Sequence, residues 1–132
     1  HRVDRRQRQM CIRDRFQTAF KRPTDMNFSD WTFDAHVADM LDLRRVLIEE
    51  EFIELSTALS MGNEEQVKKE AADLLYVVVG LFVDFGWDMQ VIFNRVHNSN
   101  MSKLGKDGEP VYREDGKVLK SDQYKEPDLS GV

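Results

Sequence analysis

Cysteine is nearly absent from this chain of 132 residues, which contains a single one, Cys11. One thiol cannot form an intramolecular disulfide, and it cannot build a cysteine-based metal site. His36 and His97 have no second histidine or cysteine at the spacing of metal ligands, so structural or surface roles are expected for them. The longest apolar run, residues 74–83, is far too short to span a bilayer, which needs about 20 apolar residues. A cytoplasmic protein without a membrane partner is therefore expected.

Basic side chains are scarce outside the first 22 residues. Residues 1–22 hold eight Lys and Arg against two acidic residues, whereas the remainder holds eleven against twenty-two. An acidic body argues against a nucleic-acid partner, because nucleic-acid affinity depends on basic groups that neutralise phosphates. The basic start has no apolar segment and joins no periodic pattern. Residues 1–15 are therefore predicted to be a disordered tail, or vector- or adapter-derived sequence, and the folded domain is expected over residues 16–129.

Glycine and proline are also few, and two of the glycines, Gly62 and Gly86, fall where helices should end. A long helix is predicted over residues 34–61, because Gly62 suits the position after a helix and Asn63 can cap the next one. The second helix should cover about residues 64–85, and a third about residues 88–98. Two long helices joined by a tight turn pack antiparallel. The expected fold class is all-α, an antiparallel helical bundle.

The second predicted helix is apolar on nearly every side over residues 74–83. A unit of three helices is too small to cover such a helix, so its spare face is expected to meet a second copy of the chain. The alternative is that Trp31, Trp87 and the N-terminal segment cover it within one chain. Trp31 and Phe33 are also expected to be the packing anchors of the turn-rich residues 24–34.

Four carboxylates recur at a spacing of three residues on the first two predicted helices. Glu51 and Glu54 lie on the first and Glu70 and Asp73 on the second, so each pair shares one helical face. Glu50, one turn before Glu54, extends the first pair. Most acidic clusters on helices are solvated, but these acids are mixed into apolar arcs, where an unpaired carboxylate is costly. Facing pairs on antiparallel helices predict a site for a hard divalent cation such as Mg²⁺ that acts on phosphates.

The chain changes character after residue 98. Residues 110–120 place an Asp-Gly turn between two short apolar stretches, which predicts a small β-hairpin, and an extended tail should follow. Most of the basic residues here serve solubility. Lys103 is the candidate to contact triphosphate oxygens, with Asn100 three residues earlier and on the same face if the third helix continues.

These motifs together resemble those of a known family. The pattern Glu50-Glu51-x-x-Glu54, followed by Glu70-x-x-Asp73, is similar to the acidic motif of MazG-like, all-α nucleoside triphosphate pyrophosphohydrolases. Four later stretches resemble the branch named after phosphoribosyl-ATP pyrophosphohydrolase: Ala72-Asp-Leu-Leu-Tyr76, Phe85-Gly-Trp-Asp88, Val96-His-Asn-Ser-Asn-Met-Ser-Lys-Leu104 and Arg113-Glu-Asp-Gly-Lys-Val-Leu-Lys120. The resemblance covers about residues 16–129.

The resemblance implies a helical homodimer, or a dimer of dimers, that uses Mg²⁺, or Mn²⁺ in its place, to convert a nucleoside triphosphate to monophosphate and pyrophosphate. It implies four metal ligands, namely Glu51, Glu54, Glu70 and Asp73. Glu50 matches the remaining acid, as an additional ligand, a support for a ligand or the base that activates water, so that Glu50 and Glu51 are the expected catalytic pair. Asn100 and Lys103 match the polar pair near the phosphates.

Three functions are compatible with this sequence. The expected one is a house-cleaning or pool-regulating pyrophosphohydrolase of nucleoside or deoxynucleoside triphosphates. The first alternative is hydrolysis of phosphoribosyl-ATP in histidine biosynthesis, which uses the same chemistry. The second is a non-catalytic helical dimerisation module whose acids are simply solvated.

Overall fold

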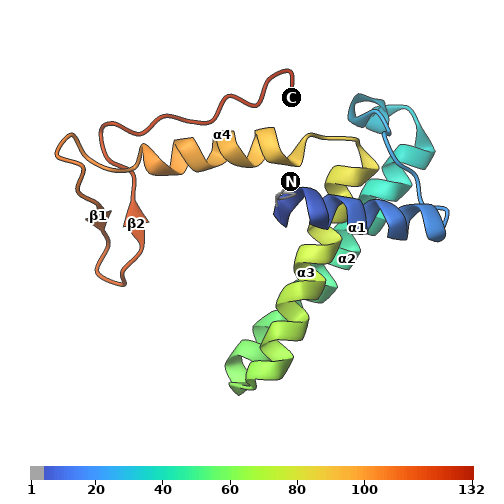
Figure 1. Cartoon of the computed structure of the whole chain (residues 1–132), viewed down its shortest axis with the longest axis horizontal. Helices are drawn as coiled ribbons and strands as arrows, with labels where there is room; N and C mark the ends of the chain where they lie inside the picture. Colours follow the sequence, from blue (N-terminus) through green and yellow to red (C-terminus); the bar gives the residue numbers. More distant parts are fainter. Residues whose placement is uncertain (1–4) are drawn as a thin grey trace. The chain divides into compact units, whose positions relative to one another are not determined.

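The computed structural model describes residues 5–132, and their side chains from residue 11 onwards. Five helical elements and one small sheet follow each other along the chain: α1 (Arg5–Ala19), the 3-10 helix η1 (Phe28–Thr32), α2 (Ala35–Met61), α3 (Glu64–Asp84), α4 (Met89–Met101), β1 (Val111–Tyr112) and β2 (Val118–Leu119) (Figure 1). The described chain is mostly helical, as predicted. It divides into two compact units, residues 1–87 and residues 88–132.

Helix α1 begins inside residues 1–15, the stretch predicted to be a tail. It runs through the predicted boundary between residues 15 and 16 without a break. Residues 1–4 of the predicted tail lie outside the described residues. The foreign origin of residues 1–15 stays a prediction.

Helices α2 and α3 begin and end within one residue of their predicted bounds. Asp34 accepts hydrogen bonds from two amides in the first turn of α2, and Asn63 accepts one in the first turn of α3. Gly62 ends α2 in the left-handed region with φ of 70°, a conformation that costs glycine little. The two helices lie side by side and antiparallel (Figure 1). Helix α4 extends three residues beyond its predicted end, to Met101, where Ser102 caps it.

The core of the unit of residues 1–87 lies where α1 and α2 pack against α3. Seven apolar side chains are buried there, at Val37, Met40, Ala58, Val77, Val79, Val83 and Phe85. Helix α1 covers part of the apolar helix α3, which agrees with the alternative that the N-terminal segment covers this helix within one chain. The cover is incomplete, because Leu75 on α3 keeps 46% of its surface exposed.

A buried polar network joins the three helices of this unit. Arg44 on α2 forms an ion pair with Asp84 at the end of α3, at 2.7 Å between Nη2 and Oδ2, and its Nε donates to the same oxygen at 2.8 Å. Gln17 on α1 donates from Nε2 to Asp84 Oδ1 at 2.6 Å. Arg44 and Asp84 are 2% and 1% exposed, so bulk water solvates neither charged group. The network therefore fixes how far α2 and α3 are shifted along each other.

The aromatic anchors of the turn-rich segment differ from those predicted. Trp31 and Phe33 are 51% and 78% exposed, so their prediction as packing residues is wrong. Phe28 makes the ring contacts of this segment, with its centroid 5.2 Å from that of Phe85 and 5.6 Å from that of Trp87, although 42% of its own surface is exposed. Phe28 begins the short 3-10 helix η1 and is the aromatic residue of this segment that meets the ring pair of Phe85 and Trp87.

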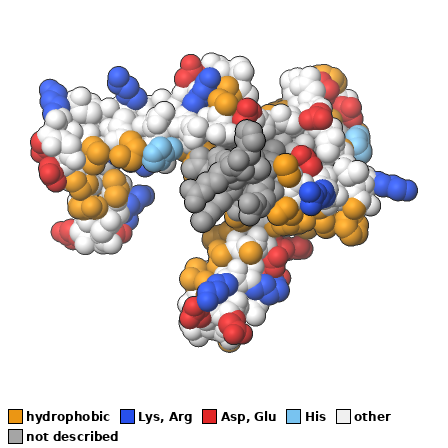
Figure 2. Space-filling model, in the orientation of Figure 1, with side chains coloured by type: hydrophobic (Ala, Val, Ile, Leu, Met, Phe, Trp, Pro, Cys, Tyr) orange, Lys and Arg blue, Asp and Glu red, His pale blue; other side chains and the backbone are white. Residues whose placement is uncertain are grey.

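The unit of residues 88–132 consists of α4, the predicted hairpin and an extended tail. Strands β1 and β2 pair antiparallel, with Val111 opposite Leu119 and Tyr112 opposite Val118. These four apolar side chains are exposed, and Figure 2 shows hydrophobic side chains gathered over the hairpin. The tail lies along α4, where the Ser99 hydroxyl donates to the carbonyl of residue 125 at 2.7 Å.

None of the described helices is by itself long and apolar enough to cross a membrane, although α3 and α4 taken together reach that length and composition.

Candidate functional site

Three carboxylates from α2 and α3 converge in the middle of the helix pair. One oxygen from each of Glu51, Glu70 and Asp73 lies within 4.8 Å of the corresponding oxygens of the other two. Glu70 and Asp73 are one turn apart on α3, and the antiparallel packing brings Glu51 of α2 opposite them. The structure therefore brings together acids whose facing arrangement was predicted from their spacing.

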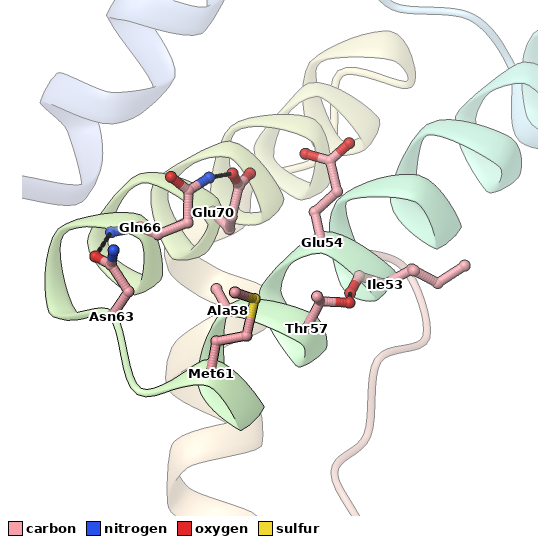
Figure 3. Close-up of a pocket in the computed structure, with 8 residues that line it drawn as sticks. All are labelled: Ile53, Glu54, Thr57, Ala58, Met61, Asn63, Gln66 and Glu70. Atoms are coloured by element: carbon pink, nitrogen blue, oxygen red, sulfur yellow. Dashed lines mark hydrogen bonds between the residues drawn. The ribbon is translucent and has the colours of Figure 1, made fainter.

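Glu70 is the buried member of this acidic cluster, with 2% of its surface exposed. Gln66, one turn earlier on α3, donates from Nε2 to Glu70 Oε1 (Figure 3). The Lys69 ammonium lies 3.0 and 3.1 Å from the two oxygens of Glu70 and 2.9 Å from Asp73 Oδ2. These contacts with Asp73 and Glu70 raise the pKa of Lys69. A buried carboxylate is thus held by an amide and an ammonium group of its own helix.

Glu51 supplies a carboxylate oxygen whose hydrogen-bonding capacity is unused. Its Oε2 is shielded from solvent and has no hydrogen-bond partner among the described residues. Loss of solvation raises the pKa of this carboxyl, and the negative charges of Asp73, Glu54 and Glu70 raise it further. An oxygen in this position gains from any cation that enters the cluster.

Glu54 lies next to this cluster, across the helix pair from Glu70 (Figure 3). The close approach of the Glu70 carboxyl group raises the pKa of Glu54, and the charge of Glu70 adds to the effect. Glu54 is more exposed than Glu51 and is outside the trio whose oxygens converge. All four predicted ligands thus belong to one electrostatically connected group.

The other three predicted residues are placed differently. Glu50 is exposed on α2 and is outside the converging trio of the described residues. Asn100 and Lys103 belong to the other unit, where the Lys103 amide donates to the Asn100 carbonyl at 3.2 Å. The condition for a shared helical face is not met, because α4 ends at Met101 and Lys103 lies in the turn beyond it.

A cavity of about 420 Å³ adjoins the acids between α2 and α3 (Figure 3). Its walls are apolar at Ile53, Ala58 and Met61, and the side chains of Asn63 and Gln66 line it as well. Gln66 and Lys69 were not predicted as members of the site. Their signal was present, because Gln66 precedes Glu70 and Lys69 precedes Asp73 by four residues.

The donor set of this site consists of carboxylate oxygens alone. Such a set suits hard divalent cations, above all Mg²⁺, Mn²⁺ and Ca²⁺, and does not suit a soft metal that prefers sulfur or imidazole. The unpartnered oxygen of Glu51 and the short mutual distances meet what a small oxygen-loving ion requires. The residues present therefore fit a divalent metal.

Comparison with protein families agrees with this chemistry. The family model described as phosphoribosyl-ATP pyrophosphohydrolase matches residues 13–100, about two thirds of the chain, and the match includes every acid of the site. A comparison with curated individual proteins finds no match. The chain therefore belongs to the phosphoribosyl-ATP pyrophosphohydrolase family, within the superfamily of MazG-like all-α nucleoside triphosphate pyrophosphohydrolases, and is a hydrolase that acts on phosphoric anhydrides.

Proposed function

We propose that the chain is a Mg²⁺-dependent pyrophosphohydrolase that converts a nucleoside or deoxynucleoside triphosphate and water to the monophosphate and pyrophosphate, in a house-cleaning or pool-regulating role. The observation that carries the proposal is the shielded, unpartnered oxygen of Glu51 inside a trio of converging carboxylates. A solvated acidic face would not bury Glu70 at 2% exposure or leave this oxygen without a donor. The site is instead arranged for a cationic ligand.

Glu51, Glu70 and Asp73 would hold the metal, with Glu54 as a fourth ligand from α2. A bound Mg²⁺, or Mn²⁺ in its place, would neutralise triphosphate charge and polarise the phosphorus that water attacks. Gln66 keeps the Glu70 carboxylate oriented through its hydrogen bond. Orientation of this kind is usual for metal ligands and contributes to affinity.

The remaining work falls to the positioning of water and substrate, because phosphoryl transfer needs little covalent chemistry from the protein. Glu50 lies one residue before Glu51 on α2 and is exposed, so its carboxylate is free to accept a proton from the attacking water. Asn100 and Lys103 would contact phosphate oxygens. Lys103 in particular supplies a positive charge to a substrate that approaches a strongly acidic protein.

The experiment that tests this function is a hydrolysis assay on a panel of triphosphates with Mg²⁺ and separate detection of pyrophosphate and orthophosphate. Glu51→Gln and Asp73→Asn should lose most turnover, about a hundredfold or more, since even a residue that only supports a ligand costs 10–100-fold. Their helical content should match the parent. Release of orthophosphate, or near-parental turnover in both variants, would contradict the proposal.

Phosphoribosyl-ATP is the second candidate substrate, and the name of the matched family favours it. This substrate carries the same triphosphate, so the acidic site would act on it in the same way. Including phosphoribosyl-ATP in the panel separates the two functions. Complementation of a histidine auxotroph would support the second candidate, whereas selective turnover of deoxynucleoside triphosphates would support the first.

We propose also that the unit of residues 1–87 pairs with a second copy. The supporting observation is the apolar surface that remains on the helix pair, where Phe52, Ile53 and Leu59 of α2 are 60–61% exposed and Leu75 of α3 is 46% exposed. A patch of this kind marks a protein contact more often than a free surface. Light scattering should give at least twice the chain mass of 15.5 kDa. A stable monomer at micromolar concentration would contradict the pairing.

A further inference from the structure

Lys69 contacts the acidic cluster in a way that the proposed metal chemistry does not use. Its ammonium nitrogen lies 2.9 Å from Asp73 Oδ2 and 3.0 and 3.1 Å from the two oxygens of Glu70. Two of the three converging carboxylates therefore share one cation that belongs to the chain itself. The next lysine, Lys68, points elsewhere and pairs with Glu64 one turn earlier.

We propose that Lys69 is a displaceable internal counterion of the metal site: it neutralises Glu70 and Asp73 while no divalent ion is bound, and it competes with the ion for the same oxygens. This inference rests on the proposed metal-dependent function. It assigns to Lys69 a role in setting metal affinity, which is distinct from ligation and from catalysis.

The need for such a counterion follows from burial. Glu70 is 2% exposed, and an ionised carboxylate at that depth is unfavourable without a partner. Asp73, Glu51 and Glu54 lie around it and add negative charge. Lys69 is the cation that contacts the buried carboxylate, so it offsets a repulsion that would otherwise loosen the helix pair.

The ability to leave follows from the exposure of Lys69. Its side chain keeps 59% of its surface in solvent although its nitrogen contacts a buried group. It reaches the cluster from the outside, along the surface of α3, and a flexible lysine stem can rotate away without moving the backbone. A divalent ion and an ammonium group on the same oxygens would repel each other strongly. Binding of the metal therefore requires that Lys69 withdraw.

The test compares Lys69→Met with the matched control Lys68→Met, which removes the neighbouring lysine and its exposed pair with Glu64. Metal affinity is measured without substrate, by Mn²⁺ titration followed by electron paramagnetic resonance and by calorimetry with Mg²⁺. We expect Lys69→Met to bind both ions about tenfold more tightly than the parent, as for removal of one competing charged contact. The control should bind like the parent.

Thermal unfolding supplies a second readout, because the deficit from losing a merely structural salt bridge would be the same with and without Mg²⁺. In EDTA, Lys69→Met should melt below the parent, because its carboxylates lose their counterion. In saturating Mg²⁺ this deficit should disappear, because the bound ion neutralises the carboxylates in both proteins. A deficit of the same size under both conditions would mean that Lys69 stays in place beside the metal, and it would overturn the proposal.

The outcomes for the metal titration also separate this inference from the proposed function. If the parent binds Mn²⁺ and Lys69→Met binds it equally or more weakly, the counterion role is refuted while metal dependence stands. If neither protein binds Mn²⁺ or Mg²⁺, both proposals fail together. Tighter binding in Lys69→Met with an unchanged control supports the exchange.

Discussion

Asp84→Asn should be among the most damaging conservative substitutions in the unit of residues 1–87. Asp84 uses Oδ2 to accept from Arg44, at 2.8 Å from Nε, and Oδ1 to accept from Gln17 at 2.6 Å. Asparagine has one acceptor oxygen, so its amide nitrogen must face either the guanidinium or the glutamine donor. One buried donor then meets another donor, and the charge of Arg44 loses its counterion.

The size of the effect follows from the burial of this pair. Removal of one partner of a buried ion pair costs about 3–5 kcal/mol, because the other charge stays buried without compensation. An unfolding entropy of about 2.1 cal/mol/K per residue gives about 280 cal/mol/K if the whole chain unfolds together. A loss of about 4 kcal/mol then lowers the melting temperature by about 14 °C. If residues 1–87 unfold as a separate unit, the same loss gives about 22 °C.

Differential scanning calorimetry and urea denaturation measure this change, with Asp42→Asn as the matched control. Asp42 also pairs with an arginine, Arg45, at 2.9 Å, but both side chains are more than half exposed, so its loss should barely move the transition. The double variant Arg44→Met/Asp84→Leu should recover part of the stability, because it removes both buried charges. The reasoning is refuted if Asp84→Asn melts no lower than Asp42→Asn.

Three further predictions concern the helix pair and the substrate. Gly80→Ala should lower stability by about 1–3 kcal/mol in urea denaturation, because its Cβ would lie 2.6 Å from Arg44 Nη1; an unchanged midpoint would contradict this packing. The close approach of the Glu70 carboxyl group raises the pKa of Glu54 in the folded protein. Above pH 4.5 the folded protein therefore binds more protons at Glu54 than the unfolded chain does. In EDTA the free energy of unfolding should therefore fall as pH rises above 4.5, and Glu54→Gln should flatten that slope in pH-dependent melts. Lys103→Ala should raise KM or lower kcat about tenfold in the triphosphate assay. Equal small effects for Lys103→Ala and Lys106→Ala would mean that Lys103 does not contact the substrate.

The helix boundaries were predictable because their signals are local. Asp34, Gly62 and Asn63 each act through hydrogen bonds or a backbone conformation within one turn of their own position. The acidic pairs were predictable for a related reason, since two residues three apart share a face on any helix. That the two acidic pairs face each other follows from one further inference, because a two-residue turn between the helices forces them to pack antiparallel.

The features that escaped prediction depend on contacts between distant parts of the chain. Arg44 and Asp84 are forty residues apart, and nothing in either local sequence marks them as partners. The choice of Phe28 over Trp31 as the packing residue depends on how η1 meets Phe85 and Trp87. The segment offers three aromatic residues, Phe28, Trp31 and Phe33, and their order along the chain does not reveal which ring meets Phe85 and Trp87.

The placement of the acids along the helix pair explains how mutually repelling carboxylates remain side by side. On α2, Glu51 lies between Arg44 and the turn at Gly62; on α3, Glu70 lies between that turn and Asp84. The turn joins the helices at one end, and the buried ion pair joins them further along. Repulsion among the acids acts between these two fixed points, so it cannot separate the helices without breaking one of them. The Arg44–Asp84 pair, together with the turn, therefore keeps the two helices in contact and allows mutually repelling carboxylates to remain close where a cation is to bind.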